Sequence, residues 1–447
     1  MGALPQTNST DLAERFDPVS VEGAVLSVSG LGIEVSDRLA MLEMNARVEI
    51  ETAAGGLLCE VAGIKDQAAL VLPFGAIDGV RRGARVRFLK NSGTVLPSRA
   101  WLGRVVNGLG RPIDGKGPLP HGNIYRSLRA SPPPAPQRAR LGPPVDFGVK
   151  ALNAFVPART GQRMGIFSAS GVGKSVLLGM IARNTACDIS VIALIGERGR
   201  EVRDFIEDHL GLEGLARAIV VVATSDEPAM MRREAGFLAL TLAEHFREEG
   251  AHVLCLMDSL TRIAMAQREI GLAAGEPPAT KGYTPSVFST LPALIERAGP
   301  GHDAGAPGHI TGVFSVLVEG DDHDEPIADA ARAILDGHIV LDRRIAECGR
   351  FPAINILRSI SRTMSGALSA DDAALVGEAK KCAAAYDDMR ELIRIGAYRQ
   401  GANADVDRAI ALHPKLEDFL SQSMDERVSS AESFNALRGI MQKDFEQ

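Results

Sequence analysis

Short apolar runs alternate with turn residues over the first ninety positions of the chain. Residues 23–28 and 68–72 are two such runs, and Gly, Asn and Asp are frequent between them. Short strands separated by turn residues are typical of a small barrel. The pattern predicts a β-barrel domain over residues 19–95. Before it, in an N-terminal segment over residues 1–18, positions 11–16 fit either one amphipathic helical turn or a frayed terminus.

The pattern changes after a proline-rich connection at residues 131–144. Continuous apolar runs at 189–195, 218–223 and 252–257 are separated by longer helical stretches. Strands that are apolar on both faces are typical of a parallel sheet covered by helices. We therefore expect an α/β domain over residues 96–365, with its ligand at the carboxyl ends of the strands.

The last part of the chain has helical periodicity. Its apolar positions recur at steps of three and four residues from Leu375 to Ile393. A second stretch, from Met424 to Phe445, has a similar helical pattern. The positions of the first stretch are Leu375, Ala379, Cys382, Tyr386, Met389 and Ile393. This spacing places them on one helical face and predicts a C-terminal helical domain over residues 366–447.

Composition narrows the class of protein. The net charge of −7 gives no general attraction to nucleic acid or to an anionic membrane. The five cysteines lie far apart, with no Cys-x-x-Cys pair, and are interpreted as buried thiols in a reducing compartment. The chain begins with no signal-peptide pattern and has no run of about 18 apolar residues, which predicts a cytoplasmic protein that does not span a membrane.

The strongest chemical signal is an apolar strand, a glycine-rich turn and a Gly-Lys-Ser sequence that opens a helical run. This arrangement is typical of a phosphate-binding loop, in which backbone N–H groups face the anion. Lys174 is expected to reach the β and γ phosphates, and the Ser175 hydroxyl to bind Mg²⁺. Ser168 replaces the first glycine of the usual pattern. The expected nucleotide-binding residues are Ser170, Gly171, Val172, Gly173, Lys174, Ser175 and Val176.

Two carboxylates stand where strands are expected to end. Asp258 closes the apolar run 252–257, as in the Walker B arrangement that holds Mg²⁺. Glu197 follows the run 189–195, at the same rim of a parallel sheet, where it could polarise an attacking water. From the residues alone, the sequence Glu-Arg-Gly-Arg-Glu at this point fits a solvated charge cluster equally well.

Several segments together resemble known ATPases. Residues 171–175, 196–202 and 258–262 occur in the order found in the catalytic subunits of rotary F-type and V-type ATPases. Five further segments are more similar to the type III secretion and flagellar export ATPases, namely residues 264–272, 275–283, 316–322, 334–341 and 395–398. Within them, residues 264–267 and 278–283 resemble the flagellar branch. The resemblance covers residues 19–420.

This resemblance implies a RecA-like P-loop ATPase core that carries the β-barrel and the helical domain. It assigns Glu197 as the general base and places Arg198 and Arg262 near the γ-phosphate. Phe351 matches an aromatic residue that stacks on adenine, and Arg362 matches an arginine finger that enters a neighbouring subunit's site. An arginine offers a planar fork to developing phosphoryl charge, which suits that role.

The resemblance also implies an assembly and a function. One chain carries both Glu197 and Arg362, which in rotary ATPases come from two subunit types, so we expect a homo-oligomeric ring of six. The implied function is Mg²⁺-dependent ATP hydrolysis that energises export of flagellar proteins. The implied partners are export-apparatus stator and stalk proteins, exported proteins and their chaperones, with peripheral association at the inner face of the membrane through partners and no nucleic acid.

Other functions were weighed against this one. A virulence-type secretion ATPase or a rotary catalytic subunit shares the fold. A hexameric RNA helicase of the transcription-terminator type would need interleaved basic and aromatic residues on the β domain. There, Phe74 and Phe88 are the only aromatic residues, and the basic cluster 81–87 is interpreted as a solvated strand edge. A non-catalytic nucleotide-binding subunit would have no use for Glu197.

Overall fold

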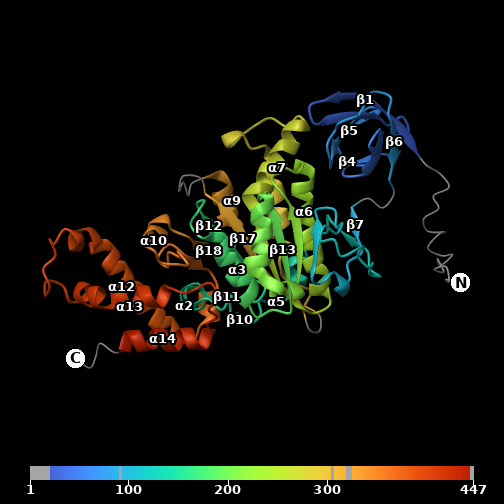
Figure 1. Cartoon of the computed structure of the whole chain (residues 1–447). Coiled ribbons are helices and arrows are strands. Elements are labelled where there is room, and N and C mark those ends of the chain that lie inside the picture. The colour runs from blue at the N-terminus through green and yellow to red at the C-terminus, as the bar shows by residue number, and fades with distance from the viewer. Residues whose placement is uncertain (1–20, 90–92, 304–306, 319–324, 443–447) are drawn as a thin grey trace. The chain divides into compact units, whose positions relative to one another are not determined.

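The computed structural model describes residues 21–89, 93–303, 307–318 and 325–442. The chain divides into two compact units (Figure 1). The first comprises residues 1–94 together with 272–276, and the second comprises the remainder of the chain. The helical turn considered at residues 11–16 lies outside the described residues.

The first unit is a closed barrel, as predicted. Its strands are β1 (Glu22–Ser29), β2 (Gly32–Ser36), β3 (Arg47–Thr52), β4 (Gly55–Lys65), β5 (Ala68–Pro73) and β6 (Arg85–Phe88). They pair in the order β1-β2-β5-β4-β3-β6, and the barrel closes through β1 and β6. Alternate residues such as Val25, Val48 and Val71 are buried inside it.

The basic cluster on β6 is paired with carboxylates of neighbouring strands. Arg85 lies 3.3 Å from Glu22, and Arg87 lies 2.8 Å from Glu49. Phe74 is buried, so its ring is not available for a base to stack on. These contacts agree with the interpretation of this cluster as a solvated strand edge.

The second unit is built on a mostly parallel sheet. Its strands are β8 (Arg104–Asn107), β12 (Arg163–Ser168), β13 (Ile189–Ile195), β14 (Ala218–Ala223), β15 (His252–Asp258), β17 (His309–Leu317), β18 (Gly337–Val340) and β19 (Ile360–Ser361). They lie in the order β19-β18-β12-β17-β15-β13-β14-β8, and the short β16 (Gly299–Pro300) pairs with β17. The predicted α/β domain is therefore confirmed, and all three apolar runs are strands.

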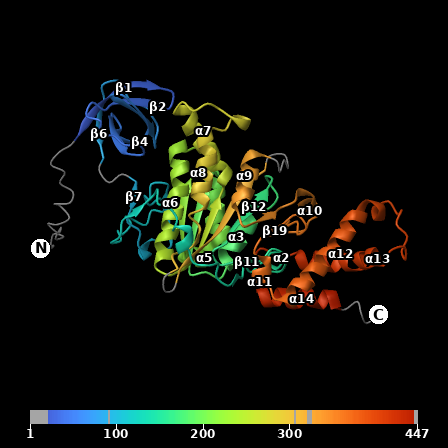
Figure 2. The same cartoon turned by 180° about the vertical axis from the view of Figure 1, so that it is seen from behind.

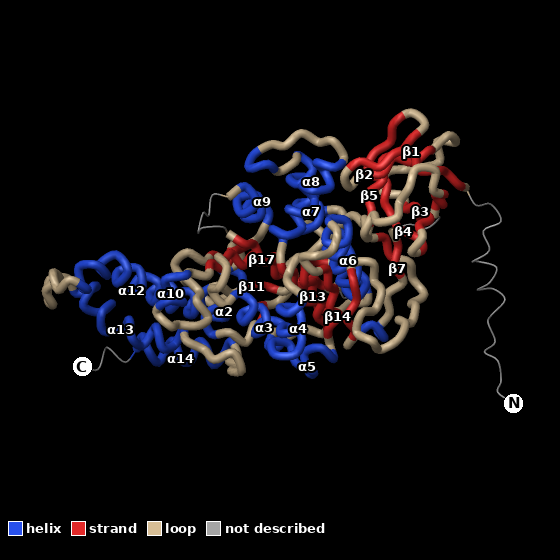
Figure 3. The backbone as a smooth tube through the Cα atoms, turned by 45° about the horizontal axis from the view of Figure 1, so that its top comes forward, coloured by secondary structure: helices blue, strands red, loops and turns tan. Residues whose placement is uncertain are grey.

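Helices cover both faces of this sheet (Figure 3). The helices along residues 148–361 are α2 (Lys150–Phe155), α3 (Lys174–Asn184), α4 (Gly199–Asp204), α5 (Gly211–Ala216), α6 (Ala229–Glu248), α7 (Leu260–Ala273), α8 (Pro285–Ile295), α9 (Pro326–Ile334) and α10 (Arg343–Glu347). Every residue of β13 is buried. Such double burial explains why the strands read as continuous apolar runs rather than as alternating ones.

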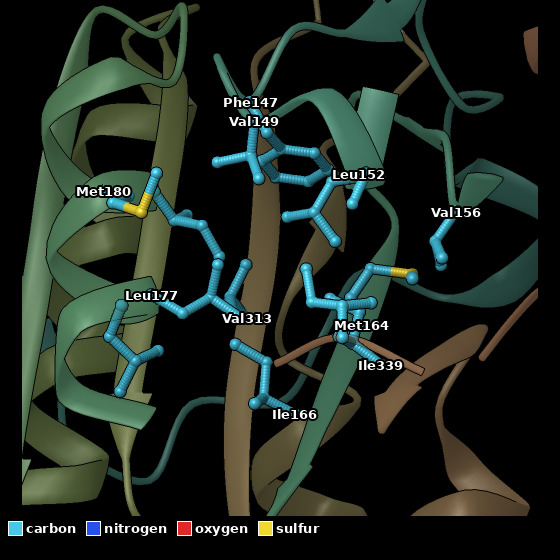
Figure 4. Close-up of a cluster of buried hydrophobic side chains, with 14 of the residues drawn as sticks. Phe147, Val149, Leu152, Val156, Met164, Ile166, Leu177, Met180, Val313 and Ile339 are labelled. Atoms are coloured by element: carbon cyan, nitrogen blue, oxygen red, sulfur yellow. The ribbon is translucent and has the colours of Figure 1, made fainter. Parts of the chain in front are cut away.

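The core on one face joins α3 to the strands (Figure 4). Leu177 and Met180 of α3 belong to the same buried cluster as Ile166 of β12 and Val313 of β17. Phe147, from the segment before α2, also lies in this cluster. The packing fixes the first turns of α3 against β12, so the loop between them has two rigid ends.

The C-terminal helices are α11 (Met364–Ala367), α12 (Ala370–Arg394), α13 (Ala404–Leu420) and α14 (Ser430–Gln442) (Figure 2). Of the six positions predicted to share one face of α12, Ala379 and Cys382 are buried, and Leu375, Tyr386, Met389 and Ile393 are half-buried. Helix α13 was not predicted. It contains Pro414, a residue that normally interrupts a helix, although Leu412 and Leu416 are buried.

The expectation of five buried thiols is wrong for two cysteines. Cys348 is exposed, because it caps the short surface helix α10, and Cys187 is partly buried. All five are free, and burial raises the pKa of the Cys59 and Cys255 thiols to about 12. No helix in the described part of the chain is long and apolar enough to cross a membrane.

A buried ion pair ties α6 to the segment after α8, and its removal is expected to destabilise the second unit strongly. The Arg297 guanidinium donates to both carboxylate oxygens of Glu244, at 2.9 and 2.6 Å, and both side chains are almost fully buried. Glu244→Ala leaves the buried cation without its partner and should cost about 3–5 kcal/mol in urea unfolding.

The matched control is Glu207→Ala, which removes the exposed pair of Glu207 with Arg203. Because solvent screens an exposed pair, this substitution should cost less than about 1 kcal/mol. Equal losses in the two variants would contradict the structural role of the buried pair.

Candidate active site

The loop that joins β12 to α3 is shaped by two glycines. Gly171 and Gly173 have φ angles of 81° and 89°, in the left-handed region that other residues rarely adopt. Helix α3 begins directly afterwards at Lys174. The first N–H groups of a helix have no partner within it and carry partial positive charge, so this loop and helix start form an anion cradle.

Lys174 connects the loop to two carboxylates. Its buried ammonium contacts the Asp258 carboxylate and lies 3.4 Å from Oε1 of Glu197. Asp258 is itself held by Ser315, whose Oγ donates to its Oδ1 at 2.6 Å. The sheet brings these groups together because β13 and β15 are parallel neighbours, and Asp258 is the last residue of β15.

Glu197 is poised to exchange a proton near neutral pH. Burial raises the pKa of its carboxyl to about 7, and the nearby charge of Asp258 and the Glu201 side chain act in the same direction. The Lys174 ammonium opposes this rise. A carboxylate with such a pKa is a stronger base than an ordinary glutamate, and general-base catalysis works best when the pKa lies near the operating pH.

These groups face a cleft of about 700 Å³. The sequence-predicted residues that line it are Ser170, Gly171, Gly173, Lys174, Ser175, Val176, Glu197, Arg198 and Arg262. Val172 is buried beneath the loop, and Asp258 reaches the cleft through its contact with Lys174. The structure therefore places most of the predicted site around one cavity.

The two arginines of the predicted site differ in their settings. The side chain of Arg262 packs on the backbone at Gly196, where an added methyl carbon would lie 2.7 Å from its Cγ. Arg198 is largely exposed, and its guanidinium lies 3.5 Å from the Glu201 carboxylate. Both side chains line the cleft, so the two guanidinium groups are available to phosphate oxygens there.

Phe351 and Arg362 do not line this cleft. A methyl carbon added at Gly173 would lie 3.4 Å from a ring carbon of Phe351, so the ring sits beside the loop, and its side chain is 45% exposed. Arg362 is exposed, and its guanidinium donates to the Arg332 carbonyl at 3.1 Å. Within one chain, the structure does not bring Arg362 into the site.

Six further cleft residues were not predicted from the sequence, namely Ser225, Thr261, Met265, Leu317, Val318 and Arg343. Three of these six lie just beyond a strand: Val318 directly follows β17, Ser225 lies two residues after β14, and Arg343 lies three residues after β18. The rule that ligands bind at the carboxyl ends of parallel strands could have identified these three. For Val318 and Arg343, the rule can be applied only if β17 and β18 are recognised as strands. The three apolar runs that predicted strands do not include them.

Models of known protein families match most of the chain. The model described as "ATP synthase alpha/beta family, nucleotide-binding domain" matches residues 148–361. The model of the same family's "beta-barrel domain" matches residues 25–90, and the "T3SS EscN ATPase C-terminal domain" matches residues 368–439. These three matches correspond to the barrel, the α/β domain and the C-terminal helices.

Whole-chain relatives agree with these matches. A flagellum-specific ATP synthase of Caulobacter vibrioides is 55% identical over 97% of this chain and 98% of its own. The chain belongs to the family of flagellar and type III secretion ATPases. The assembled ATPase EscN of the enteropathogenic E. coli type III secretion system is 40% identical, with a TM-score of 0.88 over 94% of this chain and 99% of EscN. EscN in complex with its central stalk EscO gives a TM-score of 0.85 at 39% identity over the same shares of the two chains.

As a member of this family, the chain is an ATPase that hydrolyses ATP to energise flagellar or type III protein export. The predicted resemblance and the predicted class of enzyme are confirmed. The C-terminal match and the whole-chain relatives favour this family over the transcription-terminator helicases and the non-catalytic nucleotide-binding subunits. The C-terminal match distinguishes it from the rotary catalytic subunits.

Proposed function

We propose that this ATPase serves flagellar protein export in particular. Its identity to a flagellum-specific relative supports the flagellar branch. The observation that carries the chemistry is the Lys174 ammonium at the start of α3, held between Asp258 and Glu197. A flagellated strain that lacks its own export ATPase tests the branch. We expect this chain to restore motility there and not to restore effector secretion in a strain that lacks a virulence-type ATPase; the reverse result would contradict the proposal.

In the proposed mechanism, the loop and Lys174 bind the phosphates, and water attacks the γ-phosphorus in line with the departing ADP. Lys174 turns from its carboxylate partners to the phosphates, which leaves Glu197 free to orient the water and to accept its proton. Arg198 and Arg262 stabilise the charge that develops on the transferring group. Phe351 stacks its exposed ring on the adenine beside Gly173.

The residues present fit a bound Mg²⁺. Ser175 carries a hydroxyl in the first turn of α3, and the Asp258 carboxylate ends β15 in contact with Lys174, the residue before Ser175. Mg²⁺ prefers hard oxygen ligands and is usually held by one or two protein groups together with water and phosphate. When bound, the ion supplies positive charge to the phosphate oxygens.

We further propose that the chain works as a cytoplasmic ring of six, in which Arg362 enters the neighbouring site. Its exposure, away from its own cleft, leaves the guanidinium available to another subunit. The assembly of EscN, and its complex with the central stalk EscO, support this arrangement. The expected partners are a stalk protein, a stator protein, and exported proteins with their chaperones, with membrane association only through those partners.

The raised pKa of Glu197 predicts a pH dependence of hydrolysis. Below about pH 7 this carboxyl is protonated and cannot accept the proton of water, so kcat/KM should fall about tenfold for each further pH unit and level off above pH 7. A glutamate with its ordinary pKa of 4.5 would give a flat profile between pH 6 and 8. Steady-state assays over pH 5.5–8.5 measure this, and the residual activity of Glu197→Gln should lack the step near pH 7.

A further inference from the structure

The nucleotide cleft contains a cation that the proposed mechanism leaves unused. Arg343 lines the cleft together with the loop residues and Glu197. Its side chain is exposed, and none of the described residues pairs with it or accepts a hydrogen bond from it. The other cations of the cleft have contacts of their own: Lys174 with two carboxylates, Arg198 with Glu201, and Arg262 with the Met265 sulfur at 3.7 Å.

The backbone that carries Arg343 is held firmly. The Asp342 carboxylate accepts from the Arg344 backbone N–H at 2.9 Å and from the Asn355 amide at 3.0 Å. The Asp342 N–H donates to the Ala353 carbonyl, also at 2.9 Å. These bonds fix the backbone at the start of α10, which carries Arg343. Arg344, the next residue, is also exposed but does not line the cleft.

Strand order places Arg343 across the loop from Glu197. β18 is the neighbour of β12 on one side, while β17, β15 and β13 follow on the other. The N–H of Leu341 donates to the Phe167 carbonyl at 2.9 Å, so the residues after β18 run level with the loop that follows β12. A phosphate group in the cleft would therefore have Glu197 on one side and Arg343 on the other.

The position along the loop indicates which phosphate Arg343 meets. Phe351 lies beside Gly173, near the start of α3, which places the base at that end of the loop. Arg343 follows β18 at the level of the loop's beginning, since Leu341 of the same segment donates to Phe167 near the end of β12. Leu317 and Val318, at the end of β17 on the other side of β12, also line the cleft. The end of the phosphate chain remote from the base is thus the part nearest to Arg343.

We propose that Arg343 binds the terminal phosphate of ATP from its own subunit, on the side opposite Glu197. This inference rests on the proposed function, because it takes the end of the cleft remote from Phe351 as the γ-phosphate end. Arg343 then distinguishes ATP from ADP, since only ATP presents a group to it. A guanidinium suits this role because it offers two parallel donors to phosphate oxygens.

Binding of two nucleotides tests the proposal. Arg343→Ala, Arg343→Lys and the matched control Arg344→Ala are titrated with ADP and with AMP-PNP, a non-hydrolysable ATP analogue, in the presence of Mg²⁺. We expect Arg343→Ala to weaken AMP-PNP binding about tenfold or more and ADP binding less than about threefold. Arg343→Lys should recover part of the AMP-PNP affinity, and Arg344→Ala should leave both affinities near those of the unsubstituted chain.

The outcomes separate binding from folding and assembly. Thermal melting and sedimentation at the concentration used establish that the variants share one folded and assembled state. An equal loss for ADP and AMP-PNP, or no loss for either, would overturn the role of Arg343. Because these titrations involve no hydrolysis, their result does not depend on the role of Glu197. If Glu197→Gln failed to reduce turnover, the proposed mechanism would be overturned, but the measured effect of Arg343 on nucleotide binding would stand.

Discussion

Glu197→Gln is expected to lower the turnover of ATP by about 10²–10⁴-fold while ATP binding changes little. Glutamine has nearly the same shape and still fills the space beside Lys174, but it cannot accept a proton from water. The carboxylate it replaces is the one whose pKa burial raises to about 7. The loss should therefore appear in kcat, because the proton is transferred in the transition state and not on binding.

Single-turnover hydrolysis and equilibrium nucleotide binding, measured on the same preparations, separate these two effects. The control is Glu207→Gln, since Glu207 is an exposed residue that pairs with Arg203 outside the cleft. It should hydrolyse ATP at the rate of the unsubstituted chain. Turnover of Glu197→Gln within a few-fold of that rate would show that another group activates the water.

The parts of the site that are local in sequence could be predicted from it. The phosphate loop is one continuous segment, and its strand, glycines and helix start are adjacent in the chain. Asp258 and Glu197 were also predictable, because each follows an apolar run, and parallel strands bring their carboxyl ends to one rim. Strand order alone then accounts for their shared contact with Lys174.

Residues whose role depends on tertiary packing were harder to predict. Arg343 lies after a strand of only four residues, too short to be recognised by its apolar pattern, and the turn that carries it is held by bonds from Asp342 to Ala353 and Asn355. Helix α13 was missed because local propensity disfavours Pro414, while burial of Leu412 and Leu416 stabilises the helix. Packing outweighs propensity in such cases. Cys348 is a further case in which residue type alone misleads: cysteine is usually buried, but this one lies on the surface as the C-cap of α10.

Mixing two inactive variants is expected to restore ATPase activity if each site is shared by two subunits. Lys174→Ala removes the cation at the phosphate loop, and Arg362→Ala removes the proposed finger, which should cost about 10³–10⁵-fold in turnover. Each variant alone forms rings in which every site is defective. In a mixed ring, a Lys174→Ala subunit still supplies Arg362 to a neighbour that retains Lys174, and that interface holds one complete site.

In an equimolar mixture that assembles at random, about a quarter of the interfaces have this arrangement, so activity should return to about a quarter of that of the unsubstituted ring. The control mixes Lys174→Ala with Glu197→Gln. Both residues belong to the same subunit's cleft, so no interface in that mixture has a complete site, and activity should stay at the level of the separate variants. Recovery in neither mixture, with mixed rings demonstrated by pull-down of differently tagged chains, would mean that Arg362 acts within its own subunit. Recovery in the first mixture alone requires that Arg362 crosses an interface, and it explains why a side chain that does not line its own cleft matters for hydrolysis.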